Sequence, residues 1–333
     1  MEALQKENDR LKKEVVVSKA LQFIKEDIND LLINNDLHQR MIKFISTNIF
    51  TSSFPFNNSS FENDREIILN AVTRNGKSLR YASERLKNDR EIVLAAVTSS
   101  FCALQYTSEE FRNDREIVLA AVTKDGHAIY YTSKELQNDH DIVLVAVTKN
   151  GSSLEYASEE LRGNHEIVLA AVTQNSFALR HASTRLQNDR EISLAAVTQD
   201  GSMLEYVSKR LQNDHEIVLA AVTQRGYALR YASDRLRDDR KIILAAVIQN
   251  VYVFEYASAR LKDDHEIVLT TVTRNGFALE YASTRLRNDR EIVLAAVIEH
   301  DCALKYASER LQNDPEIIQT VAESESESES ESA

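Results

Sequence analysis

Three kinds of chemically active side chain recur in this sequence at a spacing of 25 residues. A serine could act as a nucleophile, a histidine could bind a metal ion, and an arginine could bind a phosphate. The serine recurs in every full unit from Ser83 to Ser308. The histidines are His140, His165, His215 and His265, and the arginines are Arg185, Arg210, Arg235, Arg260, Arg285 and Arg310.

The serines and histidines favour structural roles over catalysis. A nucleophilic serine needs an activating base, and no histidine recurs beside it. We therefore expect a small buried hydroxyl that bonds back to its own helix. Zinc ligands must lie about 2.0–2.1 Å from one ion, whereas neighbouring helices lie about 8–10 Å apart. Because Arg65 and Arg90 stand at the same place as the histidines, we expect an exposed position, and no catalytic residue, metal or cofactor.

The arginine column is the best feature for nucleic-acid binding, since evenly spaced arginines could follow phosphates. Glu110, Glu135 and Glu160 stand at the same place earlier in the chain, which breaks a continuous track. A ladder of opposite charges between repeats is the simpler interpretation. Its acidic column is Glu166, Glu191, Glu216, Glu266 and Glu291, and a further place alternates in sign as Arg180, Glu205, Arg230 and Glu255.

These columns belong to one 25-residue unit, best seen in Asp214–Asp238. A period without insertions is typical of a solenoid, in which each unit buries its apolar face against its neighbours. Counting the first residue of each unit as position 1, positions 4, 6 and 9 are always Ile, Leu and Val, which we interpret as framework. Full units begin at Asp64, Asp89, Asp114, Asp139, Asn164, Asp189, Asp214, Asp239, Asp264 and Asp289.

Each unit reads as two short helices. Asn113 and Glu116 have the spacing of a capping box before the apolar run, and Gly126 follows it where a left-handed residue would end a helix. This first helix is apolar nearly all round, which predicts a fully buried inner layer. Ala228–Leu236 carries one apolar stripe, which predicts a single outer helix. The fold class is therefore all-α: an α-solenoid of ten two-helix repeats with an N-terminal helical cap.

The sequence divides into three parts. Residues 1–63 hold an amphipathic helix and a degenerate capping repeat, 64–322 form the solenoid, and 323–333 form a disordered Ser/Glu tail. Val17, Leu21, Ile24, Ile28 and Leu31 have coiled-coil spacing, so the first helix either caps the array or pairs with a second copy. We favour the cap, and expect a monomer or a dimer formed through this helix.

Composition narrows the class of protein. The formal net charge is −12, 43% of residues are hydrophobic, and there are only 7 Gly, 2 Pro and 2 Cys. Such values exclude collagen-like and disulfide-framework proteins and disfavour nucleic acid or an anionic membrane as a partner. Cys102 and Cys302 lie too far apart in a rigid solenoid to pair, which suits a reducing compartment. With no signal peptide or membrane span, we expect a cytoplasmic protein.

The phrase Asp-x-Glu-Ile-Val-Leu-x-Ala-Val-x-x-Asn-Gly-x-Ala-Leu-x-Tyr-Ala-Ser resembles an uncharacterised repeat family catalogued as domain of unknown function 4116. The resemblance covers Asp64 to Val321. It implies a helical repeat with an interaction role, or an accessory role in an effector of a virus or intracellular pathogen, which would place the chain in the host cytosol. It brings no catalytic residues. The motif is altered at Ser99–Phe101 and at Val251, which lack the Asn-Gly turn.

We interpret the chain as a non-enzymatic scaffold for protein–protein interaction, with nucleic-acid binding through the arginine column as the alternative. Position 14, just after the turn, varies from Lys77 to Cys302 while the framework stays fixed. Aromatic residues on an exposed ridge are favoured anchors for protein partners. Filling of a groove between repeats would explain the same rings. The aromatic residues at position 14 are Phe177, Tyr227, Tyr252 and Phe277.

Overall fold

A computed structural model describes residues 62–322 of the chain. The expectations for the N-terminal helix, for nearly all of the degenerate repeat and for the Ser/Glu tail lie outside these residues. The described residues fall into two compact units, 62–124 and 125–322. Helices and turns make up the described range, and it contains no strand, so the all-α repeat architecture is confirmed.

The first half of each repeat forms a long α-helix that begins directly after an aspartate or asparagine. Asp214 Oδ1 accepts hydrogen bonds from the amides of Glu216 and Ile217, both at 3.1 Å. The cap is therefore position 1, and Asn113, expected as the cap, instead ends the preceding short helix. The long helices are α3 Arg65–Arg74, α5 Arg90–Ser99, α7 Arg115–Lys124, α8 His140–Lys149, α9 His165–Gln174, α11 Arg190–Gln199, α12 His215–Gln224, α14 Arg240–Gln249, α16 His265–Val272 and α17 Arg290–Glu299.

The second half of each repeat is divided, and the expectation of a single outer helix is wrong in this respect. In most repeats a 3-10 helix ends at position 18, two extended residues follow, and a short helical turn closes the repeat. Ser233, with φ −62° and ψ 157°, caps that turn, and an N-cap residue takes an extended backbone. The 3-10 helices are η1 Gly76–Tyr81, η2 Phe101–Tyr106, η3 Gly126–Tyr131, η5 Gly151–Tyr156, η7 Ser176–His181, η8 Gly201–Glu205, η10 Gly226–Tyr231, η11 Val251–Tyr256, η12 Gly276–Tyr281 and η14 Asp301–Tyr306.

The closing turn of the repeat is a short α-helix in some repeats and 3-10 in others. The predicted stripe remains buried through the break, because Leu229, Ala232 and Leu236 are at most 5% exposed. The α-helical turns are α4 Glu84–Lys87, α6 Glu109–Arg112, α10 Thr184–Gln187, α13 Asp234–Arg237, α15 Ala259–Lys262 and α18 Glu309–Gln312, and the 3-10 turns are η4 Leu136–Asn138, η6 Leu161–Gly163, η9 Leu211–Asn213 and η13 Leu286–Asn288.

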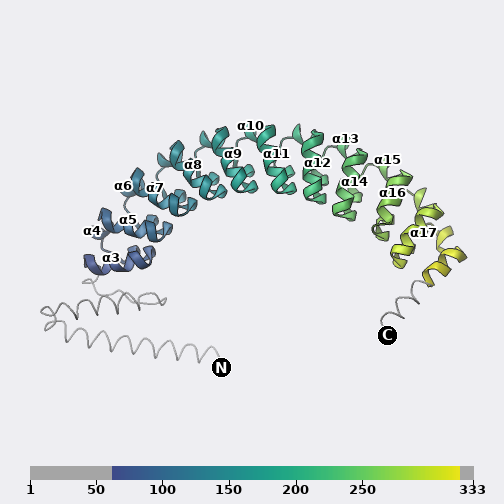
Figure 1. The fold of residues 1–333 in the computed structure, drawn as a ribbon, viewed down its shortest axis with the longest axis horizontal. Coiled ribbons are helices and arrows are strands. Elements are labelled where there is room, and N and C mark those ends of the chain that lie inside the picture. Colours follow the sequence, from purple (N-terminus) through teal and green to yellow (C-terminus); the bar gives the residue numbers. More distant parts are fainter. Residues whose placement is uncertain (1–61, 323–333) are drawn as a thin grey trace, which may run out of the picture. The chain divides into compact units, whose positions relative to one another are not determined.

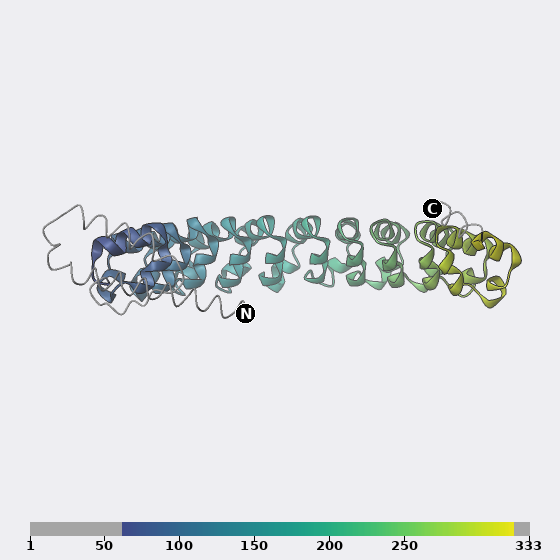
Figure 2. The ribbon, with the colours of Figure 1, turned by 90° about the horizontal axis from the view of Figure 1, so that it is seen from below.

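Within unit 125–322 the long helices lie side by side in one row and the short elements form a second row (Figures 1 and 2). The core lies between the rows, where Ile217, Val218 and Val222 are fully buried. Leu219 and Ala220, on the other side of the same helix, are only half-buried. The expectation that the first helix is buried all round is therefore wrong, because the short elements cover only one side of it.

The glycine at position 13 serves close packing between repeats. Gly126 follows the extended Asp125, with φ −156°, and begins a 3-10 helix, so it is not the left-handed residue expected there. A Cβ atom at Gly151 would lie 2.3 Å from the carbonyl oxygen of Ala171 in the next repeat. The turns that lack glycine, at Phe101, Ser176, Val251 and Asp301, nevertheless form the same 3-10 helix.

Candidate interaction surfaces

Position 14 is the second residue of each 3-10 helix, and most of its aromatic side chains are exposed. Phe177 is 45% exposed, and Tyr227 and Tyr252 are each 44% exposed. An Asn or Asp at position 12 fixes this part of the backbone in most repeats, as where Asn250 Oδ1 accepts a hydrogen bond from Tyr252 N at 3.0 Å. The backbone is thus held in place while the side chain is left to vary. We call Phe177, Tyr227, Tyr252 and Phe277 the aromatic ridge.

Phe277 differs from the other three members of the aromatic ridge. Its ring lies 4.7 Å from the ring of His300 in the next repeat, and Lys305 Nζ lies 5.9 Å from its centroid. Phe277 is half-buried by these contacts. Phe277 therefore packs between repeats, as the groove-filling interpretation supposed, whereas the rings of Phe177, Tyr227 and Tyr252 present nearly half of their surface to solvent.

The arginine column binds the preceding repeat. Arg235 donates from Nε to Asn213 Oδ1 at 2.8 Å and from Nη2 to the Asn213 carbonyl at 2.7 Å. Arg210 makes the same pair of bonds to Asn188, and Arg310 to Asn288. Arg260 and Arg285 bind Asp238 and Asp263. Hydrogen bonds from Ser258 and Ser283, followed by those from the two arginines, lower the pKa of these carboxyl groups. The partners are thus at position 25, and the acidic column at position 3 is not involved.

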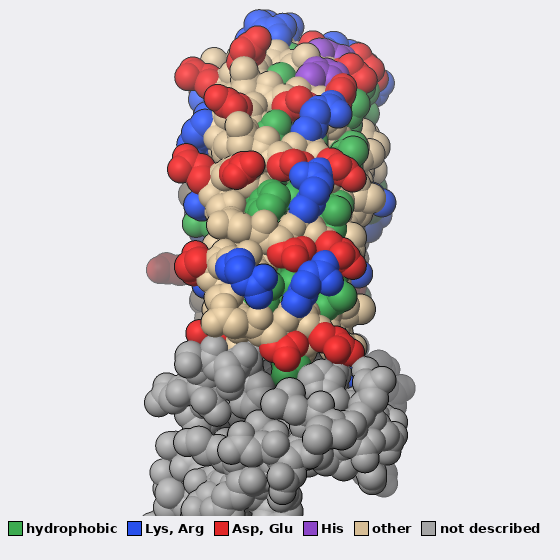
Figure 3. All heavy atoms as spheres, turned by 90° about the vertical axis from the view of Figure 1, so that its left-hand side faces the viewer, with side chains coloured by type: hydrophobic (Ala, Val, Ile, Leu, Met, Phe, Trp, Pro, Cys, Tyr) green, Lys and Arg blue, Asp and Glu red, His purple; other side chains and the backbone are tan. Residues whose placement is uncertain are grey.

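That acidic column pairs instead with position 2, which is arginine in some repeats and histidine in others. Arg90 lies within ion-pair distance of Asp114 and Glu116 in the next repeat, and these contacts lower the pKa of Asp114. His140 Nε2 lies 3.6 Å from Glu166 Oε2. In Figure 3 basic side chains accordingly stand beside acidic ones. Charges do join the repeats, but from position 2 to positions 1 and 3 of the next repeat, and not between the arginine column and the acidic column as expected. Within residues 62–322 no group of three or more His, Cys, Asp or Glu side chains could hold a metal ion.

In most repeats of unit 125–322 the recurrent serine also joins repeats, whereas Ser83 Oγ and Ser108 Oγ in unit 62–124 are buried without a hydrogen-bond partner. Ser233 Oγ donates to Asn213 Oδ1 of the preceding repeat at 2.6 Å, and its backbone amide donates to the Gln212 carbonyl at 2.9 Å. Ser233 Oγ also accepts a bond from Leu236 N at 3.3 Å. The expected bond back to its own helix is therefore present as a cap. The shorter bond is to the neighbouring repeat, and the residue pattern of a single repeat does not indicate such a contact.

The alternating charges at position 17 do not pair with one another. Glu205 accepts a hydrogen bond from the Tyr231 hydroxyl at 2.8 Å, and the Arg230 guanidinium lies 4.6 Å from the centroid of the same ring. Burial, followed by the bond to Glu205, raises the pKa of Tyr231. The tyrosine at position 18 thus lies between the two charges. The expected pairing of Arg230 with Glu205 is replaced by contacts of each with this ring.

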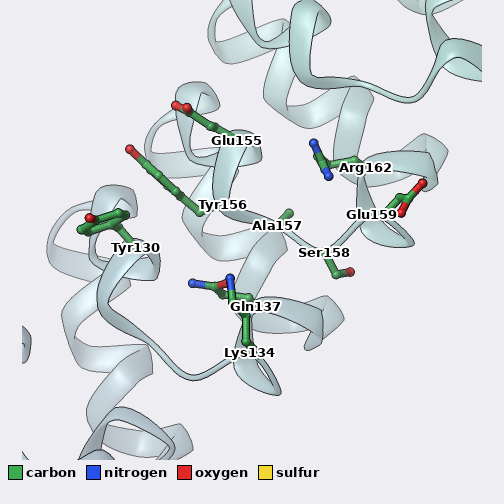
Figure 4. A pocket seen from close by; sticks show the side chains of 9 residues that line it. All are labelled: Tyr130, Lys134, Gln137, Glu155, Tyr156, Ala157, Ser158, Glu159 and Arg162. Atoms are coloured by element: carbon green, nitrogen blue, oxygen red, sulfur yellow. The ribbon is translucent and has the colours of Figure 1, made fainter.

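A cavity of about 450 Å³ opens between two neighbouring repeats of unit 125–322 (Figure 4). Tyr130 and Tyr156 line it with ring centroids 5.0 Å apart, and Lys134 and Arg162 supply positive charge. Tyr130 is 58% exposed. The sequence contains a feature that could have indicated this cavity. Among the full repeats, Tyr130 is the single aromatic residue at position 17, which is otherwise charged or Gln.

Within unit 125–322 backbone hydrogen bonds join neighbouring repeats, as from Ser158 N to the Gln137 carbonyl, and such stacked repeats define a helical solenoid. The family model described as domain of unknown function (DUF4116) matches residues 64–112, 114–162, 164–212, 189–237, 214–262, 264–312 and 289–325. The chain therefore belongs to this repeat family. No curated protein and no solved structure matches the chain. Within residues 62–322 no helix is long and apolar enough to cross a membrane.

Proposed function

We propose that the chain is a non-enzymatic cytoplasmic scaffold that binds a partner protein through the three exposed rings of the aromatic ridge, Phe177, Tyr227 and Tyr252. The observation that carries the proposal is the contrast between fixed and variable positions. Leu229 and Leu236 are fully buried. Tyr227 is 44% exposed, and the residue type at its position differs from repeat to repeat. Rigid exposed aromatic rings are common binding hot spots. Cys102 and Cys302 form no disulfide, which suits a reducing compartment.

The contacts of the arginine column support protein over nucleic acid as the partner. Each column arginine from Arg210 to Arg310 donates hydrogen bonds from Nε and from Nη2 to position 25 of the preceding repeat. A phosphate would have to compete with these bonds or use the remaining donors. Binding through these arginines would also be strongly dependent on salt.

The test replaces Phe177, Tyr227 and Tyr252 together by serine in the full chain. We expect that partner proteins are no longer captured from lysate and that Tm stays unchanged, because these rings are exposed. Phe277→Ser is the matched control, and it should lower Tm through lost contact with His300. A large Tm loss in the triple variant would mean that the rings belong to the core. Capture that persists in the triple variant but disappears when Arg210 and Arg235 become Glu, with salt-sensitive RNA or DNA binding, would support the nucleic-acid alternative.

A further inference from the structure

The long helices of unit 125–322 carry a second surface, on the side away from the short elements. Position 6 is leucine in every repeat, yet each of these leucines is only half-buried. Position 7 is mostly alanine, and position 10 is threonine or isoleucine. Ile248 and Ile298 at position 10 are 57% and 68% exposed. We call this surface the leucine face; its leucines are Leu144, Leu169, Leu194, Leu219, Leu244, Leu269 and Leu294.

Core packing does not account for the constant leucine, since the interior-facing positions 4, 5, 8 and 9 already fill the core. A large side chain at position 6 beside a small one at position 7, as in Leu219 and Ala220, produces ridges and grooves of the kind that receive another helix. The leucine face is therefore shaped as a packing surface that has no partner among residues 125–322.

Polar groups on this face are mostly bonded within the scaffold. Thr198 Oγ1 and Thr223 Oγ1 donate to the Leu194 and Leu219 carbonyls, at 2.8 and 2.7 Å. At the edge of the face, Gln224 Nε2 donates to the Thr198 carbonyl at 3.3 Å. An extended peptide would find few groups here to pair with its backbone. A helix satisfies its own backbone hydrogen bonds, so it is the secondary structure that this face fits.

The face also has a charge preference. The acidic column lies along it at the helix N-termini, and Glu166, Glu191 and Glu216 remain 68%, 69% and 63% exposed despite their contacts with His or Arg at position 2. The helix C-termini on the opposite edge add partial negative charge. At that edge position 11 is Gln in four consecutive repeats, from Gln174 to Gln249. A partner therefore gains from carrying positive charge beside its apolar stripe.

The spacing fits a heptad repeat. Consecutive long helices such as α11 and α12 pack against each other, and packed helices lie about 8–10 Å apart. A partner helix that crosses them advances about 10.5 Å in seven residues. We propose that the leucine face binds an amphipathic α-helix of a partner protein that carries a heptad apolar stripe flanked by Lys or Arg. This site is separate from the aromatic ridge.

The experiment titrates the full chain with two labelled 21-residue helical peptides that share a leucine heptad stripe, one flanked by Lys and one by Glu. The Lys-flanked peptide should bind at least tenfold more tightly. Glu191→Lys with Glu216→Lys should reverse this preference, and Lys241 shows that the same position accepts lysine. Leu194→Asp with Leu219→Asp should abolish binding of both peptides.

Substitution of Tyr227 and Tyr252 by serine is the control and should leave peptide binding unchanged, so that either proposal can fail without the other. Equal binding of the two peptides, or binding that survives Leu194→Asp with Leu219→Asp, would overturn the proposal. So would a sedimentation result in which the chain is a dimer that Leu219→Asp converts to a monomer, because a second copy would then occupy the face. Circular dichroism of each variant checks that the helices remain.

Discussion

At the scale of single residues, the contact between Ser at position 20 and Asn or Asp at position 25 shows how neighbouring repeats depend on each other. Ser208 Oγ donates to Asn188 Oδ1 at 2.5 Å, and Ser308 Oγ donates to Asn288 Oδ1 at 2.6 Å. Gly163 occupies position 25 in one repeat and offers no side chain. Ser183 Oγ, which faces it, is buried without a hydrogen-bond partner.

The missing hydrogen-bond acceptor for Ser183 predicts a stabilising substitution. A Cβ atom at Gly163 would lie 3.7 Å from Ser183 Oγ, so a side chain fits. Gly163→Asn should raise the free energy of unfolding by about 1 kcal/mol, since it supplies Ser183 with an acceptor. Ser183→Ala should then cost more in the Gly163→Asn background than in the wild type, which urea unfolding of the four proteins measures. Gly163→Ala is the control, and equal effects of Asn and Ala would contradict the hydrogen bond.

A second glycine predicts the opposite result. Gly151→Ala would place a Cβ atom 2.3 Å from a backbone oxygen in the next repeat, and backbone cannot move aside as a flexible side chain does. We expect a loss of about 1–3 kcal/mol in the free energy of unfolding, the usual cost of overpacking. Guanidinium chloride unfolding measures it. An unchanged midpoint would show that the neighbouring repeats separate easily.

At the scale of elements, the sequence was most informative about the long helix. The apolar run and its acidic first turn correctly placed ten-residue helices such as α12, and the stripe Leu229–Leu236 correctly marked the buried side of the second half. The break in the second helix does not follow from the sequence, because the apolar residues keep helical spacing on both sides of Ser233. The break arises from contacts with the preceding repeat, and a one-dimensional pattern carries no information about those contacts.

The N-caps of the long helices lie one residue later than the sequence indicates, again because of contacts with a neighbouring repeat. Asn113 and Asp114 are both good N-cap residues. Asp114 caps the helix, while position 25 binds the serine and arginine of the following repeat, as Asn213 does. The leucine at position 6 is only half-buried although it never changes, because constancy among repeats does not by itself require burial. The member of the aromatic ridge that packs between repeats, Phe277, could be identified only once His300 was seen beside it.

The junctions between elements predict a dependence on pH. Hydrogen bonds from Ser283 and Arg285 lower the pKa of Asp263, and those from Ser258 and Arg260 lower the pKa of Asp238. A carboxyl group with a depressed folded pKa stabilises the protein above its unfolded pKa, about 3.9, and this stabilisation is lost as pH falls through the folded value.

Replacement of both aspartates by asparagine tests this dependence. Asn213 and Asn288 already hold the same contacts in other repeats, so the variant should fold. The wild type should have the higher Tm at pH 7, and the difference should shrink below about pH 4 as the carboxyl groups become protonated. Melting curves recorded between pH 7 and pH 2 measure this difference. A difference that is constant across that range would show that the charges at these junctions do not matter.

At the scale of the whole molecule, the contacts run between neighbouring repeats, so stability should depend on position along the array. Leu204, in a central repeat of unit 125–322, is fully buried, whereas Leu304 at the same position of the last full repeat is only half-buried. Leu204→Ala should cost about 2–5 kcal/mol, the usual loss for a core leucine, and Leu304→Ala clearly less. Hydrogen exchange resolved by repeat measures the two losses. Equal losses would contradict a stability built from pairs of neighbours.

Protein binding through the aromatic ridge is tested most directly by site-specific photo-crosslinking in the full chain. A photoreactive phenylalanine analogue is placed in turn at Tyr227 on the ridge and at Arg210 in the arginine column, and the chain is irradiated in lysate of its source cell. We expect a discrete protein adduct from position 227, resistant to nuclease and competed by unlabelled wild-type chain. A nuclease-sensitive adduct from position 210, with none from position 227, would contradict protein binding through the ridge.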